Sequence, residues 1–167
     1  SVTDEVMDYL KLMNSMHENH KVIGFPLNKD FASFKNNLKS HCTKDYIFQI
    51  DADEIPHEFL VEYLGQVLEE NPVDIVFVPR GNTVEGLTQE HINKWKWNVN
   101  EKGWVNWPDY QTRIYKNTED VTWMNKVHER ITGYDTFSNF PSEERWSLYH
   151  HKQIDRQEKQ NEFYETI

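Results

Sequence analysis

Apolar residues in the first half of the chain alternate between helical spacing and short continuous runs. Apolar side chains at helical spacing predict helices that begin near residue 4 and cover residues 30–42 and 56–70. Short apolar runs predict strands over residues 21–25, 46–50 and 73–79. Helices that alternate with strands are typical of an α/β fold, in which helices flank a mostly parallel sheet.

The second half of the chain has a different pattern. Residues 81–107 are polar and rich in tryptophan, with a short helix predicted over residues 88–95. Further on, the pattern predicts strands over residues 110–115, 126–132 and 145–149, and a polar helix over residues 155–164. A chain of 167 residues can bury a core as one domain. We therefore expect a single domain over residues 1–167, whose halves, 1–80 and 81–167, differ in function.

Acidic residues outnumber basic ones. The chain carries 28 Asp and Glu against 18 Lys and Arg, a net charge of −10. This charge repels nucleic acid and anionic membrane surfaces, so we expect neither as a general partner. Cys42 is the single cysteine, which excludes an intrachain disulfide. Because we find no signal peptide and no apolar run long enough to span a bilayer, we expect a soluble cytoplasmic protein.

Three acidic side chains, Asp51, Asp53 and Glu54, come directly after the apolar run of residues 46–50. In an extended segment Asp51 and Asp53 point the same way. The carboxyl end of a buried strand is also where open α/β sheets bind ligands. Two like charges this close favour a counter-ion, and Mg²⁺ or Mn²⁺ with a bound diphosphate supplies one. The alternative is an acidic loop that caps a helix starting at Pro56.

Further candidates for chemistry lie in the second half of the chain. Asp109 can act as a general base if it is partly desolvated, and Arg113 can pair with Asp109 or with a phosphate. The imidazole of His128, which precedes Glu129, can complete a metal site built on carboxylates. His150–His151 is a second candidate of this kind. The alternative for each is a structural ion pair or an exposed histidine.

Two more features can serve a ligand of the nucleotide or sugar class. Lys35 and Asn36 can present a cation and an amide to a phosphate or a base, although a solvated helix face is the alternative. Four tryptophans are set in polar sequence, where sugar rings could stack on them: Trp95, Trp97, Trp104 and Trp107. The alternative for the tryptophans is a small satellite core under a long loop.

Taken together, these segments resemble the family-two glycosyltransferases of the GT-A fold, and in particular the branch of lipopolysaccharide-core β-glucosyltransferases. Four segments follow the order of the family. Residues 30–36 resemble its "F-(small)-x-x-R-N" helix, with Lys35 in place of arginine. Residues 45–54 resemble its strand ending in "D-A-D-E", residues 107–115 its "W-x-P-D-x-Q-x-R" segment, and residues 127–129 its "V-H-E".

The resemblance implies transfer of a sugar from a nucleotide-sugar donor, a UDP-sugar, with Mn²⁺ or Mg²⁺ as the cofactor. It implies that residues 1–80 form the nucleotide-sugar and metal half. On the donor side, Asp51 would lie near the ribose and the metal, and Asp53 would coordinate the metal on the diphosphate. Lys35 and Asn36 would lie beside the nucleotide, and Arg113 would contact the cofactor.

On the acceptor side, the resemblance implies that residues 81–167 bind a glycan or lipid-linked acceptor, which can place the protein at the inner face of a membrane. Asp109 would be the base that deprotonates the acceptor hydroxyl, and Glu129 would lie near the acceptor. His128 would lie near the metal or the diphosphate. A carboxylate opposite the departing diphosphate gives one in-line displacement, which inverts the anomeric centre.

The start of the chain departs from the family pattern. The family begins with two strands and an acidic turn, whereas residues 1–4 resemble only the end of that turn, with Asp4 as a remnant of the nucleotide pocket. We therefore expect an N-terminally truncated domain, and an exposed sheet edge that can pair two copies of the chain. Two alternatives stay open: a non-catalytic nucleotide-sugar or glycan-binding fragment, and a metal-dependent phosphodiesterase or nuclease.

Overall fold

The computed structural model describes residues 2–165 of the chain, with side chains described as far as Lys159. Ser1, part of the segment that resembles the acidic turn, lies outside the described residues. The elements, in chain order, are α1 Asp4–Met16, α2 Phe31–Ser40, β1 Tyr46–Phe48, β2 Glu54–Pro56, α3 Glu58–Glu70, β3 Ile75–Glu85, α4 Gln89–Trp95, β4 Val105–Lys116, β5 Thr122–Met124, β6 Arg130–Thr132, β7 Phe137–Asn139, the 3₁₀ turn η1 Glu144–Trp146, β8 Leu148–Gln153 and α5 Ile154–Glu165.

The helices begin at capping residues that the sequence marks. The hydroxyl of Thr3 accepts a hydrogen bond from the Val6 N–H at the start of α1, and Asp30 accepts one from the Ser33 N–H at the start of α2. Thr88 caps α4 in the same way, as the short helix predicted over residues 88–95 requires. Within the described residues, no helix combines the length and the apolar character needed to cross a membrane.

The chain divides into two units. Unit 1 consists of Ser1–Cys42 with Trp123–Arg130, and unit 2 consists of Thr43–Thr122 with Ile131–Ile167. Unit 1 contains α1 and α2, and the Phe31 N–H at the start of α2 donates to the main-chain oxygen of Lys126 at 2.9 Å. Unit 2 contains the larger sheet together with α3, α4 and α5.

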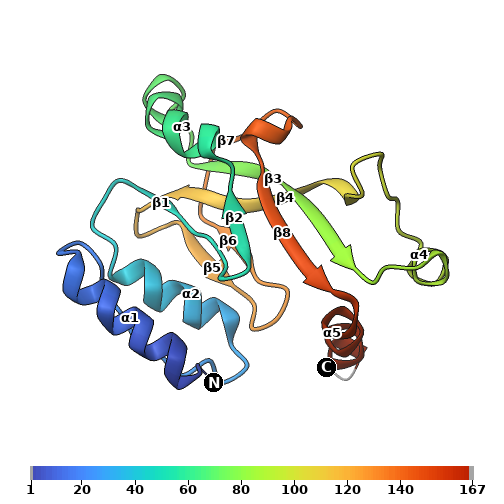
Figure 1. The fold of residues 1–167 in the computed structure, drawn as a ribbon. Coiled ribbons are helices and arrows are strands. Elements are labelled where there is room, and N and C mark those ends of the chain that lie inside the picture. The colour runs from blue at the N-terminus through green and yellow to red at the C-terminus, as the bar shows by residue number, and fades with distance from the viewer. Residues whose placement is uncertain (1, 166–167) are drawn as a thin grey trace. The chain divides into compact units, whose positions relative to one another are not determined.

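The larger sheet has the strand order β1-β4-β3-β8-β2, and β7 also pairs with β3 (Figure 1). β3 runs parallel to β8 and β7, whereas the pairs β1–β4, β3–β4 and β2–β8 are antiparallel. The α/β class is therefore confirmed. The expectation that most neighbouring strands run parallel is wrong, because three of these five strand pairs are antiparallel. The reason is β4, which lies between β3 and β1 and runs antiparallel to both.

The core of unit 2 lies between the sheet and α3. Six side chains form it, with relative exposures of 4% or less: Leu60, Val76, Val78, Ile114, Phe140 and Leu148. The indole of Trp146 stacks on the ring of Phe140 at a centroid distance of 4.8 Å and closes this cluster at η1. This core holds β3, β4 and β8 together, and polar residues of these strands carry the candidate site.

Some predicted boundaries are wrong. The run of residues 21–25 forms no strand, and of residues 126–132 only the end forms one, β6. Residues 54–56 form β2 where a helix start was expected, so α3 begins at Glu58. β3 continues past Pro79 to Glu85. On the edge of β3 opposite β4, Pro79 lies between the segment paired with β7 and the segment paired with β8, so its missing N–H breaks no strand pairing there.

Candidate active site

A buried carboxylate, that of Glu54 on β2, lies at the centre of the polar residues of unit 2. Its side chain has no exposed surface. Its Oε1 accepts hydrogen bonds from Arg113 Nη2 at 2.6 Å and from Arg80 Nη1 at 2.9 Å. Burial raises the pKa of Glu54, but the hydrogen bond and charge of Arg113, followed by Arg80, outweigh burial and lower it. Glu54 is therefore an ionised carboxylate that holds two guanidinium groups in place.

Arg113 joins Glu54 to Asp51. Arg113 Nη2 also donates to Asp51 Oδ2 at 2.5 Å, and the Asp51 N–H donates to Glu54 Oε2 at 3.1 Å. The Arg113 side chain is only 4% exposed. Burial lowers the pKa of Arg113, whereas Glu54 and Asp51 raise it by a larger amount. Asp51, which is 43% exposed, is thus the solvent-facing end of a buried ion-pair chain.

Arg80 joins Glu54 to Asp109. Arg80 and Asp109 lie directly opposite each other on the antiparallel strands β3 and β4. Arg80 donates to Asp109 Oδ2 through Nε at 3.0 Å and Nη2 at 2.7 Å. Asn82 Nδ2 donates to the same oxygen at 2.8 Å, and Gln111 Nε2 donates to Oδ1 at 2.8 Å. Burial raises the pKa of Asp109, but Arg80 and these amides lower it by a larger amount, so Asp109 is ionised at neutral pH.

His150 on β8 extends the network to Asp53. Its Nδ1 lies 2.7 Å from Asn82 Oδ1, and its Nε2 lies 3.6 Å from Asp53 Oδ2. Asn82 donates to Asp109 through Nδ2, so its Oδ1 accepts the Nδ1 proton of His150 and the Nε2 lone pair faces Asp53. Burial, then Arg80, lowers the pKa of His150, which keeps the imidazole neutral. Arg156 Nη2 also lies 3.2 Å from Asp53 Oδ2.

Unit 1 holds a second set of the predicted residues. Lys35 Nζ on α2 lies 2.5 Å from Glu129 Oε1 and 4.2 Å from the centroid of a Trp123 ring. Asn36 uses both ends of its amide on the main chain of Trp123, donating at 2.8 Å and accepting at 2.9 Å. His128 has a positive φ of 54°, in the turn before Glu129. The loop that carries His128 and Glu129 is thus fixed against α2.

In a comparison with protein families, residues 1–146 match the family described as Glycosyl transferase family 2. The chain belongs to glycosyl transferase family 2. The match covers unit 1 and unit 2 as far as Trp146, and it includes all the predicted site residues up to Glu129. In a second comparison, no curated protein matches the chain. The family supports glycosyl transfer as the activity, with a nucleotide-sugar donor and an acceptor.

The predicted site residues of this family-2 chain fall into two groups. Unit 2 joins Asp51, Arg113 and Asp109 through the ion pairs of Glu54, and Asp53 lies near them beside His150. Unit 1 holds the others, which are Asp4 in the exposed first turn of α1, Lys35, Asn36, His128 and Glu129. Among the residues that the structure describes, no group of three or more His, Cys, Asp or Glu side chains is arranged to hold a metal ion.

Arg113 does not pair with Asp109, which was one of the two pairings expected for it. Four residues apart on β4, the two positions are separated by about 13 Å along the strand. Arg80 takes that place instead, because it lies across the ladder from Asp109. The sequence carried one signal for Arg80: a lone arginine follows the apolar run of residues 73–79. The burial of Glu54 has no signal in the sequence, because it depends on the pairing of β2 with β8.

The four tryptophans form two pairs rather than one cluster. The Trp95 and Trp97 rings have centroids 4.7 Å apart, and those of Trp104 and Trp107 are 4.5 Å apart. Trp104 is 6% exposed and packs on Gly81, where an added Cβ would come within 2.9 Å of its indole. Trp104 is therefore a core residue, whereas the half-buried Trp97 remains accessible.

Proposed function

We propose that this chain is an inverting glycosyltransferase that moves a sugar from a nucleotide-sugar donor, a UDP-sugar, to a hydroxyl of a glycan or lipid-linked acceptor. The observation that carries the proposal is the state of Asp109. It is ionised, partly accessible and fixed by Arg80, Asn82 and Gln111 within a member of glycosyl transferase family 2. A carboxylate held in this way can accept a proton without changing its position.

In the proposed reaction, Asp109 takes the proton of the acceptor hydroxyl. The acceptor oxygen then forms a bond to the anomeric carbon while the bond from that carbon to the diphosphate oxygen breaks. The electron pair of the broken bond leaves with the nucleoside diphosphate, and attack from the opposite face inverts the configuration. The low pKa of Asp109 makes it a weak base, which suits a reaction in which proton transfer accompanies bond formation.

Asp53 and His150 fit a divalent cation. The 3.6 Å between Asp53 Oδ2 and His150 Nε2 exceeds a hydrogen bond. A carboxylate and an imidazole lone pair face each other there, and a cation would stabilise the pair. Mn²⁺ or Mg²⁺ bound there would act as a Lewis acid that stabilises charge on the diphosphate. Mg²⁺ prefers oxygen ligands, so the imidazole favours Mn²⁺. Asp51, in the same unit as Asp53, stays proposed as a further ligand, and the metal role of His128, which belongs to unit 1, stays a prediction.

The same proposal assigns roles to the other predicted site residues. Lys35, Asn36 and Asp4 would lie beside the nucleotide, and Glu129 would lie near the acceptor. Arg113 would act on the donor through Asp51, because its guanidinium is nearly buried between Asp51 and Glu54. It is therefore a positioning residue, since a side chain that is 4% exposed offers little surface to a phosphate.

One observation favours a second candidate, a non-catalytic nucleotide-sugar binding protein. Both carboxylates of the Asp51–Asp53 pair already contact arginines, Asp51 through Arg113 and Asp53 through Arg156. A cation would have to displace Arg156, which is 70% exposed and can leave at low cost. If Arg156 stays, the chain would bind the donor without the metal that assists departure of the diphosphate.

The proposed function is tested first by binding. Thermal unfolding is followed with UDP, ADP and GDP and their glucose conjugates, each with and without Mn²⁺. A ligand at about 100 times its dissociation constant stabilises the folded state by about 2.7 kcal/mol. We expect a rise in the midpoint with one nucleotide and with Mn²⁺ together. If no nucleotide changes the midpoint under either condition, the proposal is wrong.

The role of Asp109 is tested by comparing Asp109→Asn with Glu129→Gln. General base catalysis contributes about 10²- to 10⁴-fold, so Asp109→Asn should lower kcat by that factor while UDP binding persists. Glu129→Gln should mainly raise KM for the acceptor. If donor hydrolysis and transfer by Asp109→Asn equal those of the wild type, Asp109 is not the base. A loss of kcat in Glu129→Gln alone would move the role there.

A further inference from the structure

A small cavity in unit 2 is lined by β3, the start of β4, β8, α5 and the loop that carries Trp97. It has a volume of about 110 Å³, well below the roughly 300–1,000 Å³ of pockets that hold a drug-sized ligand. It therefore suits one substituent of a ligand and not a whole nucleotide sugar. Two of its residues, Arg80 and Asn82, donate hydrogen bonds directly to Asp109.

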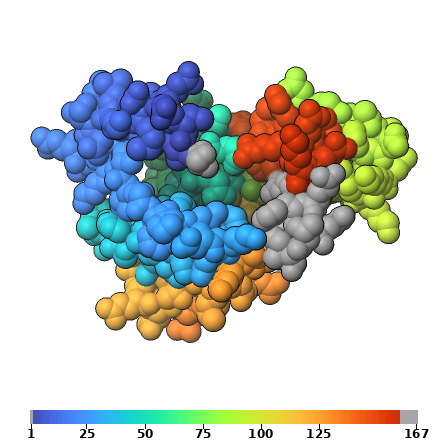
Figure 2. Space-filling view, turned by 90° about the horizontal axis from the view of Figure 1, so that it is seen from below, coloured from blue at the N-terminus to red at the C-terminus, as the bar shows by residue number. Residues whose placement is uncertain are grey.

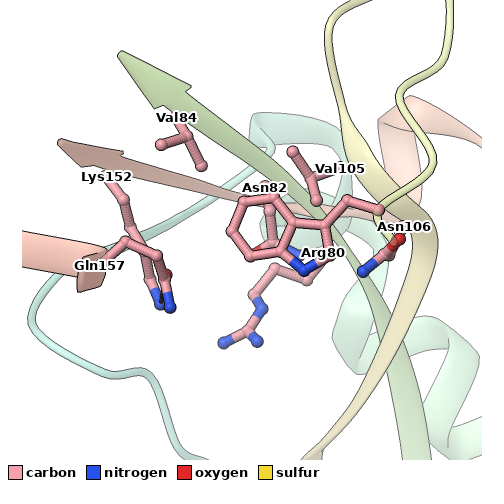
Figure 3. Close-up of a pocket in the computed structure, with 8 residues that line it drawn as sticks. Arg80, Asn82, Val84, Val105, Asn106, Lys152 and Gln157 are labelled. Carbon is pink, nitrogen blue, oxygen red and sulfur yellow. Dashed lines mark hydrogen bonds between the residues drawn. The ribbon is translucent and has the colours of Figure 1, made fainter. Parts of the chain in front are cut away.

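The two charged side chains that line the cavity, Arg80 and Lys152, are both cationic, although the chain as a whole carries a net charge of −10. Figure 3 shows Arg80, Lys152 and Gln157 directing their polar ends to the same side of the cavity. Lys152 Nζ donates to Gln157 Oε1 at 3.1 Å, and Gln157 comes from α5. Both cations are thus held in fixed positions by neighbouring elements.

The positive charges of Arg80 and Lys152 repel each other. Burial, then the charge of Arg80, lowers the pKa of Lys152. Arg80 donates to Asp109 and Glu54 through Nε, Nη1 and Nη2, but a guanidinium has more N–H donors than these contacts use. An oxyanion between Arg80 and Lys152 would receive charge-assisted hydrogen bonds and relieve this repulsion.

The rest of the lining suits a sugar. Trp97 provides an aromatic ring, on which the C–H face of a pyranose can stack, and Asn106 provides an amide for hydroxyl groups. Val84 and Val105 form an apolar side.

In the wider surroundings, α5 lies beside the segment that contains α4, as the red and yellow-green regions of Figure 2 show. His91 Nε2 lies 3.5 Å from Glu158 Oε1 at this contact.

We propose that this cavity binds an oxyanion, a carboxylate or a phosphate, carried by the acceptor sugar. The inference rests on the proposed function, because it takes Asp109 as the base for the acceptor hydroxyl. A charged substituent held by Arg80 and Lys152 would place a hydroxyl of the same sugar next to Asp109. Lys152 and Gln157 follow the residues that match the family, so this specificity would belong to the C-terminal segment of this chain.

The test measures binding of four probes by ligand-observed NMR: glucose, glucuronic acid, glucose 6-phosphate and inorganic phosphate. We expect at least one of the two anionic sugars to bind about tenfold more tightly than glucose, which corresponds to about 1.4 kcal/mol. Binding of glucuronic acid alone would assign a carboxylate, and binding of glucose 6-phosphate alone would assign a phosphate. Equal binding of glucose and both anionic sugars would overturn the inference.

Variants separate the cavity from general charge effects. Lys152→Gln should weaken the anionic sugar about tenfold, and Lys152→Arg should restore it. Lys159→Gln removes the same charge from an exposed position of α5 outside the cavity and should leave binding unchanged. Circular dichroism confirms that each variant folds. If Lys152→Gln and Lys159→Gln have the same effect, or Lys152→Arg fails to restore binding while folded, the cavity is not the site.

Two further outcomes distinguish the inference from the proposed function. Trp97→Ala should weaken the anionic sugar but not inorganic phosphate. If it weakens neither, the cavity holds only an oxyanion and no acceptor sugar, which overturns the inference. If UDP with Mn²⁺ stabilises the protein but no anionic sugar binds, the inference falls alone. If an anionic sugar binds through Lys152 but no nucleotide binds, the proposed function falls, and with it the assignment of that sugar as acceptor.

Discussion

Replacing Glu54 by glutamine removes the central charge of the site with little change in shape. The Glu54 carboxylate accepts charge-assisted hydrogen bonds from Arg113 at 2.6 Å and Arg80 at 2.9 Å. Breaking a buried ion pair from one side costs about 3–5 kcal/mol, since the partner charge stays buried. Arg113 keeps Asp51, and Arg80 keeps Asp109. We therefore expect the lower end of this range, a loss of about 3 kcal/mol in the free energy of unfolding.

The loss can be measured by urea unfolding at pH 7, with fluorescence and circular dichroism as two probes. With a slope of about 1–3 kcal/mol per molar urea, the midpoint should fall by roughly 1–3 M. Glu143→Gln is the matched control, because Glu143 pairs with Arg145 at 2.8 Å and both side chains are about half exposed. An exposed pair contributes less than about 1 kcal/mol, so this variant should unfold close to the wild type.

The pH dependence provides a second check with a definite sign. The pKa of Glu54 is lower in the folded protein than its ordinary value of 4.5. Its ionisation therefore stabilises the fold above pH 4.5, and this contribution is lost as the pH falls through the folded-state pKa. The difference between wild type and Glu54→Gln should be largest at neutral pH and shrink below about pH 4.5. A pH-independent difference, or one below 1 kcal/mol, would refute the reasoning.

Three further predictions concern backbone contact, a side-chain clamp and metal binding. Gly81→Ala should destabilise the protein by about 1–3 kcal/mol in urea unfolding, because the new Cβ meets the rigid indole of Trp104, and an unchanged midpoint would contradict this. Asn36→Ala should cost about 1–3 kcal/mol by the same assay, because both its hydrogen bonds to the main chain of β5 are lost, and it should speed amide exchange in that strand. His150→Ala should weaken Mn²⁺ binding in the presence of UDP at least tenfold, whereas the exposed His151→Ala should not, and equal effects would place the metal elsewhere.

Local signals in the sequence predicted the helices, and the strands depended on contacts that such signals do not contain. Thr3 and Asp30 cap α1 and α2, and such capping residues can be read locally because a capping side chain acts within three residues of its own position. The run of residues 21–25 has strand-like composition but no strand partner among the described residues, and Val22 and Phe25 stay exposed. A strand needs a neighbour, and local composition does not say which segment will lie beside it.

The same limit applies to the candidate site. The sequence marked Asp51, Asp53 and Asp109, because acidic residues at strand ends are visible as a pattern. It did not reveal Arg80 or the burial of Glu54, because both depend on the order β1-β4-β3-β8-β2. Arg80 faces Asp109 because β4 pairs antiparallel with β3, and local sequence patterns do not predict which strands pair.

The ion pairs of unit 2 form one chain in which acids and bases alternate: Asp51, Arg113, Glu54, Arg80 and Asp109. The proposed donor-side carboxylate and the proposed base are its two ends, and the buried Glu54 is its middle. Each arginine is shared between Glu54 and one of the two aspartates. If that aspartate is neutralised, the ion pair of the arginine with Glu54 becomes stronger. A cation that binds Asp51 and breaks its ion pair with Arg113 would therefore change the strength of the Arg80–Asp109 ion pair, and with it the pKa of Asp109. We therefore expect Mn²⁺ binding to shift the pH dependence of transfer in the wild type. In Glu54→Gln the charge that links the two arginines is removed, so Mn²⁺ should no longer shift it.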